Sequence, residues 1–300
     1  MQLIIFGSGR WAQEIYKEAI KLTYLSKIIL VTNNNDAKLK FAIFKKKLLL
    51  YKCLSPDILK KKSKIIICNS ARNHFETLKK IINLKHDILI EKPLFDHIKH
   101  LKLLRSKKNI FFSRVFAFDY YLNLFSQKIN KIMFSKVNID WYDSKNEKRY
   151  NQIKKHDLRI KYNLDVFSHL MNLVEIITKK KIEKIDDYRI KIDKKDESIF
   201  SIKCNKILFE FKISRIRQKR KRYIRVEDLK KNIHEIDFSK NNMILKKNSK
   251  YLTTQYSYKT TGNLSKMIES FLYKKKEINK LDINYGIKYI KLHNMIFNKK

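Results

Sequence analysis

Two of the four glycines in this 300-residue chain lie near its start, as Gly7-Ser8-Gly9. They follow the short apolar run 3–6 and precede a stretch with helical periodicity at 10–23. A strand that turns directly into a helix needs residues without a Cβ at the tight turn and at the closest approach to a phosphate. The helix N-terminus then offers that phosphate free N–H groups and the positive end of the helix dipole. This pattern predicts a strand, a tight turn and a helix at the start of the fold.

With Ala12 in the third small position, the segment G-S-G-R-W-A matches the dinucleotide-binding fingerprint in the context that the fingerprint requires. The residues that we expect to bind the dinucleotide here are Gly7, Ser8, Gly9, Arg10 and Trp11. The alternative is an ordinary strand-to-helix turn that binds nothing.

The choice between NAD(H) and NADP(H) depends on the end of the second predicted strand. A carboxylate about 20 residues after the fingerprint would bind the ribose 2′-hydroxyl of NAD. Asn33 occupies the expected position, and Asp36 follows too late and is interpreted as a helix-start residue. Arg10 is placed where it could approach a phosphate. The sequence therefore leaves NAD(P)(H) open and favours NADP(H).

Up to residue 113, apolar runs alternate with helical patterns, which predicts βαβ units and a parallel sheet. We expect strands at 2–6, 27–32, 47–52, 64–69, 87–90 and 109–113, and helices near 10–23, 36–45, 72–84 and 96–106. The run 65–68 is apolar throughout, as in strands that are buried on both faces. The chain is therefore predicted to be α/β, with a Rossmann dinucleotide-binding domain at 1–115.

Residues 116–300 show a different pattern, with extended segments that alternate apolar and polar residues. We expect strands at 131–142, 182–193, 197–204, 206–214, 222–226 and 233–237, a helix at 163–178, and a terminal helix pair near 263–275 and 282–297. This alternation predicts an α+β domain with a mostly antiparallel open sheet.

The formal net charge of +40 is typical of proteins that bind nucleic acid or anionic membranes. Here, however, Lys far outnumbers Arg, the lysines are spread along the whole chain, and Lys, Ile, Asn, Phe and Tyr are enriched together, as AT-rich codons would produce. We therefore interpret the charge as a solvated surface and do not expect nucleic acid as a partner.

Three widely spaced cysteines, Cys53, Cys68 and Cys204, predict reduced thiols, with neither a disulfide framework nor a metal site. No apolar run approaches the ~20 residues of a membrane span. The chain also enters its first strand without the basic segment of a signal peptide. We expect a cytoplasmic protein that has no membrane partner.

Three further motifs follow predicted elements. The tripeptide E-K-P at 91–93 ends the fifth strand, N-H at 73–74 follows the fourth strand, and D-x-x-x-H at 165–169 lies on the helix of the second domain. With these motifs the chain resembles the glucose–fructose oxidoreductase / inositol dehydrogenase (Gfo/Idh/MocA) family over essentially its whole length. It departs from the family at Ser70-Ala71, where Thr-Pro is usual, and at Asn172, where the family often has Asp.

The resemblance implies hydride transfer between a nicotinamide and a carbon that bears a hydroxyl, on a sugar, a cyclitol or a nucleotide-linked sugar. His169 would then transfer the proton, Asp165 would orient its imidazole or bind the substrate hydroxyl, and Lys92 would stabilise negative charge on the reacting oxygen. The residues that the resemblance assigns to the cofactor side are Ser70, Asn73, His74, Glu91 and Lys92. It also implies a homo-oligomer, with subunit contacts on the second sheet.

Each of these residues also has an ordinary structural interpretation. Lys92 would be one more surface lysine, His169 a satisfied histidine on a half-buried helix, and Asn73 and His74 the cap of the helix at 72–84. Reduction of an imine or another carbonyl-like bond is a rival reaction on the same scaffold. A dinucleotide sensor without catalysis and a basic nucleic-acid-binding protein are rivals of other classes.

The run 214–222 is the one arginine-dense segment of the chain. It would contact a phosphate of a nucleotide-sugar or of nucleic acid. The interpretation that we favour is a basic hairpin on the rim of the second sheet, and a role in subunit contacts also stays open.

Overall fold

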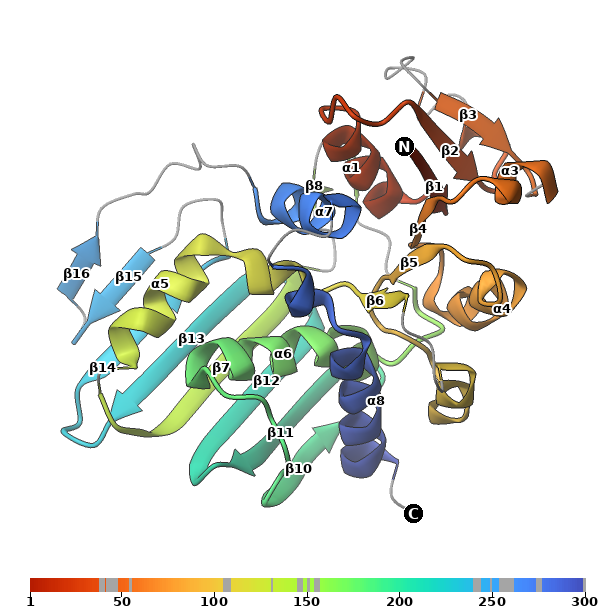
Figure 1. Cartoon of the computed structure of the whole chain (residues 1–300). Helices are drawn as coiled ribbons and strands as arrows, with labels where there is room; N and C mark the ends of the chain where they lie inside the picture. Colours follow the sequence, from red (N-terminus) through yellow and green to blue (C-terminus); the bar gives the residue numbers. More distant parts are fainter. Residues whose placement is uncertain are drawn as a thin grey trace. The chain divides into compact units, whose positions relative to one another are not determined.

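The computed structural model of the chain describes residues 1–37, 41, 48–53, 56–104, 109–130, 132–144, 148–149, 152–153, 157–239, 244–248, 250–253, 262–273 and 277–298. It divides into two compact units (Figure 1). Unit 1 comprises Met1–Phe118 and Asn263–Lys291, and unit 2 comprises Asp119–Gly262 and Leu292–Lys300. The division after Phe118 lies close to the expected boundary at 115. Residues 263–291, which we expected in the second domain, pack within unit 1, because helical periodicity does not specify which apolar surface a helix covers.

The sheet of unit 1 has six parallel strands in the order β3-β2-β1-β4-β5-β6, which is the Rossmann order. The strands are β1 (Gln2–Phe6), β2 (Lys27–Val31), β3 (Leu48–Tyr51), β4 (Lys64–Ile67), β5 (Asp87–Ile90) and β6 (Ile110–Phe112). All six were predicted from the sequence, and β2, β4 and β5 consist almost entirely of buried residues. The predicted parallel sheet is therefore confirmed.

The helical elements of unit 1 are α1 (Arg10–Ala19), α3 (Pro56–Lys60), η2 (Ala71–Asn73), α4 (His74–Ile81), η3 (Ile98–Leu104), η4 (Val115–Phe118), α7 (Asn263–Tyr273), η5 (Ile278–Leu281) and the first part of α8 (Ile283–Phe297). The predicted helix at 96–106 is a 3₁₀ helix, and most of the one predicted at 36–45 lies outside the described residues. Helices α1 and α7 cover one face of the sheet, where Leu3, Ile5, Ile15 and Phe271 share one core.

Unit 2 contains an eight-stranded sheet in the order β10-β11-β12-β7-β13-β14-β15-β16, in which only the β12–β7 pair is parallel. The strands are β7 (Phe134–Ser144), β10 (Asp187–Asp193), β11 (Glu197–Cys204), β12 (Ile207–Arg217), β13 (Lys221–Asp228), β14 (Ile233–Asp237), β15 (Ile244–Lys247) and β16 (Lys250–Thr253). A separate pair is formed by β8 (Lys148–Arg149) and β9 (Gln152–Ile153). The mostly antiparallel open sheet is confirmed, although β15 and β16 were not predicted.

The predicted basic hairpin at 214–222 is wrong. Strands β12 and β13 do not pair with each other, because β7 lies between them and pairs with both. A short polar turn between two strands is compatible with a hairpin, but strand neighbours are selected by long-range packing.

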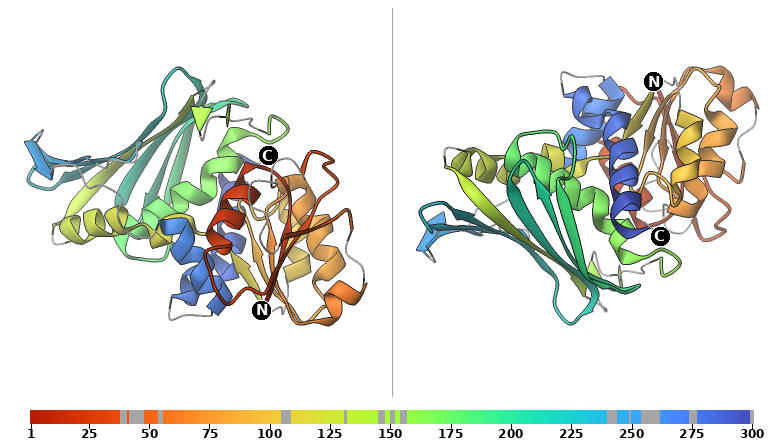
Figure 2. Two further views of the ribbon diagram at one scale, coloured as in Figure 1. Left: turned by 90° about the horizontal axis from the view of Figure 1, so that it is seen from above. Right: turned by 90° about the horizontal axis from the view of Figure 1, so that it is seen from below.

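One face of this sheet is covered by α5 (Tyr120–Ile129) and α6 (Tyr162–Thr178) (Figures 1 and 2). Helix α5 was not predicted. It begins at Asp119, whose carboxylate accepts hydrogen bonds from the backbone N–H groups of Tyr121 and Leu122, both at 3.0 Å. Phe167 of α6 stacks on Phe200 of β11, with the ring centroids 6.3 Å apart. Buried residues alternate with more exposed ones along β7, as expected for a strand of which one face is covered.

Candidate active site

The two glycines of the first turn are glycine for different reasons. Gly7 has a φ of +127°, and a Cβ there would lie 2.9 Å from the backbone N of Asn69. The fold itself therefore requires glycine at this position, where β1 and β4 end side by side. Gly9 has a φ of −66°, which any residue adopts, and a Cβ there would meet no described atom within 4 Å. Within the described part of the chain nothing requires glycine at position 9, so the open space fits a ligand that approaches the backbone closely.

Helix α1 begins at this open space. Its first turn holds no acidic residue, and no side chain caps its N-terminus. The backbone N–H groups of the first turn and the positive end of the dipole are therefore suited to an anion. Around them, Arg10 is half-buried, Trp11 is 36% exposed, and Asn33 is exposed at the end of β2. These are the donors and surfaces that the sequence assigned to a dinucleotide.

Ser8 is buried, and its hydroxyl oxygen accepts a hydrogen bond of 2.8 Å from the hydroxyl of Thr32. The oxygen of Thr32 in turn accepts from the backbone N–H of Asn34, at 3.1 Å. The bond between Thr32 and Ser8 joins the glycine-rich turn to the end of β2. Thr32 was not singled out in the sequence, although its place as the last residue of the predicted strand at 27–32 was a usable signal.

Glu91 and Lys92 follow β5 at the carboxyl end of the parallel sheet. Glu91 is 6% exposed, and burial raises the pKa of its carboxyl, while hydrogen bonding by Trp11 and Ser113 opposes that rise. Lys92 is half-buried, and its backbone N–H donates to the Glu91 carboxylate at 3.3 Å. Glu91 thus links the first turn of α1 to the ends of β5 and β6, a connection that the sequence did not reveal.

Asn73 occupies the N-cap position of α4 and His74 begins the helix, but neither side chain caps it as predicted. Asn73 is exposed and its side chain makes no cap hydrogen bond. His74 is 1% exposed, with its ring nitrogens 3.1 Å from the carbonyl oxygen of Asn69 and 3.0 Å from that of Pro93. Burial lowers the pKa of this imidazole. His74 therefore connects the loop after β4, which includes half-buried Ser70, to the loop after β5. The two loops lie close together because β4 and β5 are neighbours in the sheet.

In unit 2, Asp165 and His169 lie one helical turn apart on α6, and both are half-buried. The imidazole of His169 stacks on the indole of Trp141 in β7, with 5.3 Å between the ring centroids and 25° between the planes. Tyr162 begins α6 and is fully buried. Burial, followed by the negative charges of Asp143 and Asp165, raises its pKa well above the ordinary value. The helix therefore presents Asp165 and His169 beside a buried cluster of charged and aromatic groups.

The arginine-dense run is largely neutralised inside unit 2. Arg215 and Arg222 are each 3% exposed and pair with Asp196 and Asp143. The exposed Arg217 and the half-buried Lys221 pair with Glu197 and Asp140, at 2.6 and 2.5 Å. The carboxylates come from other strands and turns of the unit, so the run does not present these four cations as a phosphate site.

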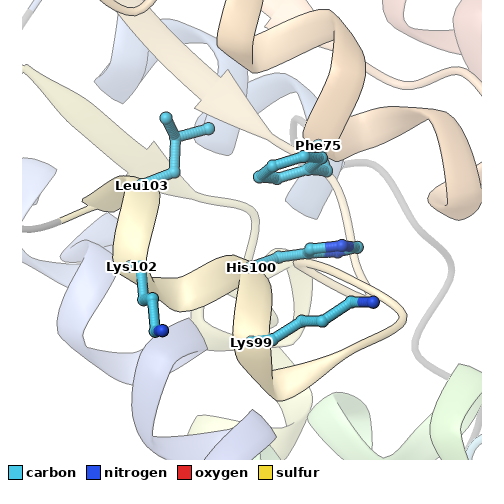
Figure 3. A pocket seen from close by; sticks show the side chains of 5 residues that line it. All are labelled: Phe75, Lys99, His100, Lys102 and Leu103. Carbon is cyan, nitrogen blue, oxygen red and sulfur yellow. The ribbon is translucent and has the colours of Figure 1, made fainter.

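A shallow hollow of about 610 Å³ lies between α4 and η3, lined by Phe75, Lys99, His100, Lys102 and Leu103 (Figure 3). The ring of His100 stacks on Phe75 at 4.0 Å between centroids. None of the residues expected at the active site lines it. Within the described ranges, no group of three or more His, Cys, Asp or Glu residues could hold a metal ion, and no helix is both long and apolar enough to cross a membrane.

The six-stranded sheet and its glycine-rich first turn define unit 1 as a Rossmann domain, and unit 2 adds the open sheet. No protein-family model and no curated protein sequence matches the chain. Solved structures do match the fold. The UDP-N-acetylglucosamine 3-dehydrogenase of Acidithiobacillus ferrooxidans aligns with a TM-score of 0.75 at 12% identity, covering 99% of this chain and 96% of that one.

Two other structures extend this likeness. The aldose–aldose oxidoreductase of Caulobacter crescentus has a TM-score of 0.73 at 11% identity and covers 99% of this chain and 96% of its own. A Desulfitobacterium hafniense protein described as an NADPH-dependent oxidoreductase has a TM-score of 0.72 at 11% identity, and the alignment covers 97% of this chain and 92% of that one. The neighbours are Gfo/Idh/MocA-type dehydrogenases, so the resemblance read from the motifs is confirmed for the fold.

Proposed function

We propose that the chain is an NAD(P)-dependent oxidoreductase that transfers hydride to or from a carbon of a sugar, a cyclitol or a nucleotide-linked sugar. The observation that carries the proposal is Gly9. Gly9 lies at the N-terminus of α1, which no side chain caps. Neither its backbone conformation nor the described atoms around it require a glycine there. A phosphate-bearing ligand accounts for both features. The names of two structural neighbours, a nucleotide-sugar dehydrogenase and an aldose oxidoreductase, support the substrate class.

For the cofactor we propose NADP(H). The exposed position at the end of β2 is Asn33, which does not repel a 2′-phosphate as a carboxylate would, and Arg10 supplies a cation in the same unit. One neighbour is described as NADPH-dependent, which agrees with this choice. The residues that would hold the dinucleotide are Gly7, Gly9, Arg10, Trp11, Asn33, Ser70 and Lys92, with Ser8, Asn73, His74 and Glu91 shaping the loops. A bound nicotinamide would accept or supply the hydride.

At the reacting centre we propose Lys92, Asp165 and His169. The imidazole of His169 takes the proton of the substrate hydroxyl during oxidation and returns it during reduction, because an imidazole titrates close to neutral pH. Asp165, one turn earlier on α6, holds that imidazole in one orientation or accepts a second substrate hydroxyl. The ammonium group of Lys92 stabilises negative charge that develops on the reacting oxygen.

Substitution of Gly9 by alanine tests the cofactor site. The new Cβ points into open space, so the folded protein keeps its stability while NADPH affinity falls about tenfold or more, the equivalent of ~1.4 kcal/mol. Gly262→Ala is the matched control, since a Cβ there also meets no described atom within 4 Å. Nicotinamide fluorescence titrations at two salt concentrations measure both affinities. Equal affinity in the wild type and Gly9→Ala, or binding in the wild type that disappears with salt, would overturn the cofactor proposal.

Substitution of the reacting groups tests catalysis separately. Lys92→Met and His169→Asn are expected to lower kcat by about 10²–10⁴-fold. NADPH affinity should stay at the wild-type value in His169→Asn and fall only a few-fold in Lys92→Met, because Lys92 is one of several residues that would hold the dinucleotide. Turnover is followed by nicotinamide absorbance with UDP-N-acetylglucosamine, glucose and myo-inositol. Lys79→Met, at an exposed position of α4, is the control lysine. Retention of full activity in both variants would remove these residues from the mechanism, and tight NADPH binding without turnover on any substrate would favour a dinucleotide sensor.

A further inference from the structure

The half-buried imidazole of His169 rests on Trp141, with 5.3 Å between the ring centroids and 25° between the planes. Trp141 is 3% exposed and belongs to β7. The terminal torsion of a histidine side chain has a broad distribution when nothing packs on the ring. A stacked indole narrows that distribution, because ring pairs favour a limited set of relative orientations.

Two further side chains pack against Trp141. The guanidinium carbon of Arg222 lies 3.8 Å from the indole centroid, close enough for a cation–π interaction. Arg222 is the register partner of Trp141 on β13, so the two side chains share one face of the sheet. Phe238 packs edge-on at 6.3 Å between centroids. The indole therefore lies in a packed environment and cannot tilt freely with the imidazole.

Arg222 is immobilised by its hydrogen bonds. It is 3% exposed and donates to the carboxylate of Asp143, which is 2% exposed, and to the carbonyl oxygens of Tyr142 and Lys221. A buried guanidinium that left these acceptors would lose its compensation for desolvation. The planar group therefore keeps a fixed position against the indole.

The same carboxylate reaches the helix that carries His169. Tyr162, the first residue of α6, is fully buried, and after burial the negative charge of Asp143 is the largest cause of the raised pKa of its hydroxyl. Asp143 therefore bonds to the arginine that contacts the indole and lies close to the start of α6.

We propose that Trp141 is a positioning residue, which the buried Arg222–Asp143 pair holds in place and which sets the plane of the His169 imidazole for proton transfer. The inference rests on the proposed function, in which His169 moves the proton. Nothing in the resemblance to known motifs points to it, because Trp141 and Arg222 lie far from the D-x-x-x-H motif in sequence and meet it only in the folded unit.

The test of the stack is NMR spectroscopy of the histidine ring protons in the full chain. The signal of His169 is assigned by its loss in His169→Gln. Stacking on an indole shifts these protons upfield, and we expect Trp141→Leu to move them to the position of an unstacked histidine, whereas Trp141→Phe keeps part of the shift. An unchanged His169 signal in Trp141→Leu would overturn the proposal whatever reaction the protein catalyses.

The kinetic arm uses NADP⁺ with UDP-N-acetylglucosamine. Trp141→Leu is expected to lower kcat by about 10²-fold, the effect of misplacing a catalytic group by ~1 Å, while NADPH affinity stays at the wild-type value. Trp141→Phe should restore most of kcat. The control is Phe209→Leu, a buried aromatic position of β12, which should lose stability but keep kcat. A kcat as high in Trp141→Leu as in Phe209→Leu would reject the positioning role. If the wild type turns over no substrate, the proposed function fails, and the NMR result alone decides on the stack.

Discussion

Replacing Lys64 by methionine is expected to lower the free energy of unfolding by about 3–5 kcal/mol. Lys64 opens β4 and is 8% exposed, and its ammonium group lies 3.0 Å from the carboxylate of Asp87, which is 3% exposed and opens β5. The same ammonium donates to the carbonyl oxygen of Phe271 in α7, at 2.9 Å. The methionine variant leaves a buried carboxylate without its partner and a carbonyl without its donor, and both costs fall on the folded state.

Urea-induced unfolding measures this effect, and two further variants interpret it. Lys64→Met/Asp87→Leu removes both charges and should recover most of the lost stability, since an apolar pair of similar volume replaces a buried ion pair at little cost. Lys21→Met breaks the exposed pair with Glu18 on α1 and should change the stability by less than about 1 kcal/mol. If Lys64→Met were as mild as Lys21→Met, the buried pair would not connect β4, β5 and α7 in the way described.

The stability of the protein is expected to fall by about 3 kcal/mol through His293 alone between pH 6.5 and pH 4. Burial lowers the pKa of this histidine from 6.5 to about 4. Above pH 6.5 the ring is neutral in both the folded and the unfolded chain, so the contribution is fully present. Below that pH the unfolded chain binds a proton that the folded chain excludes, and the stability is lost progressively as the pH falls to about 4.

The surroundings of His293 explain why a neutral ring is needed. Its Nε2 lies 3.2 Å from the side-chain oxygen of Asn163, whose amide nitrogen donates to Asp193 at 2.7 Å. Phe167 packs edge-on against the imidazole at 5.3 Å between centroids. The amide of Asn163 is fixed by Asp193, so Nε2 is the donor and one proton satisfies the ring.

His293→Gln tests this prediction, because glutamine can donate to Asn163 but does not titrate. Unfolding free energies at several values between pH 4 and pH 7.5 should show a weaker pH dependence in the variant than in the wild type. His97→Gln, at an exposed position, should leave the wild-type dependence unchanged. Since burial also lowers the pKa of His74 and His86, some dependence persists in His293→Gln. Identical curves for wild type and His293→Gln would contradict the assignment to His293.

The candidate site could be predicted wherever its signal is local. The glycine-rich turn, the E-K-P end of β5 and the four-residue spacing of Asp165 and His169 are each written in a few consecutive residues, together with the strand or helix that carries them. The contacts around them could not be predicted. The stack of Trp141 with His169 and the contact of Glu91 with Trp11 join residues far apart in sequence, and a single sequence holds no record of such pairs.

By itself the sequence determined the six parallel strands, the alternation of the second sheet and helix α6, because the period of apolar residues follows from the geometry of each element alone. Only the tertiary structure decided that β7 separates β12 from β13, that α7 packs in unit 1, and that Arg222 is buried on Asp143. It also distinguished the two glycines: the backbone at Asn69 leaves no room for a Cβ at Gly7, whereas no described atom excludes a Cβ at Gly9. Strand neighbours, helix faces and buried charges depend on which distant surfaces fit together, and that choice is made by the packing of the whole chain.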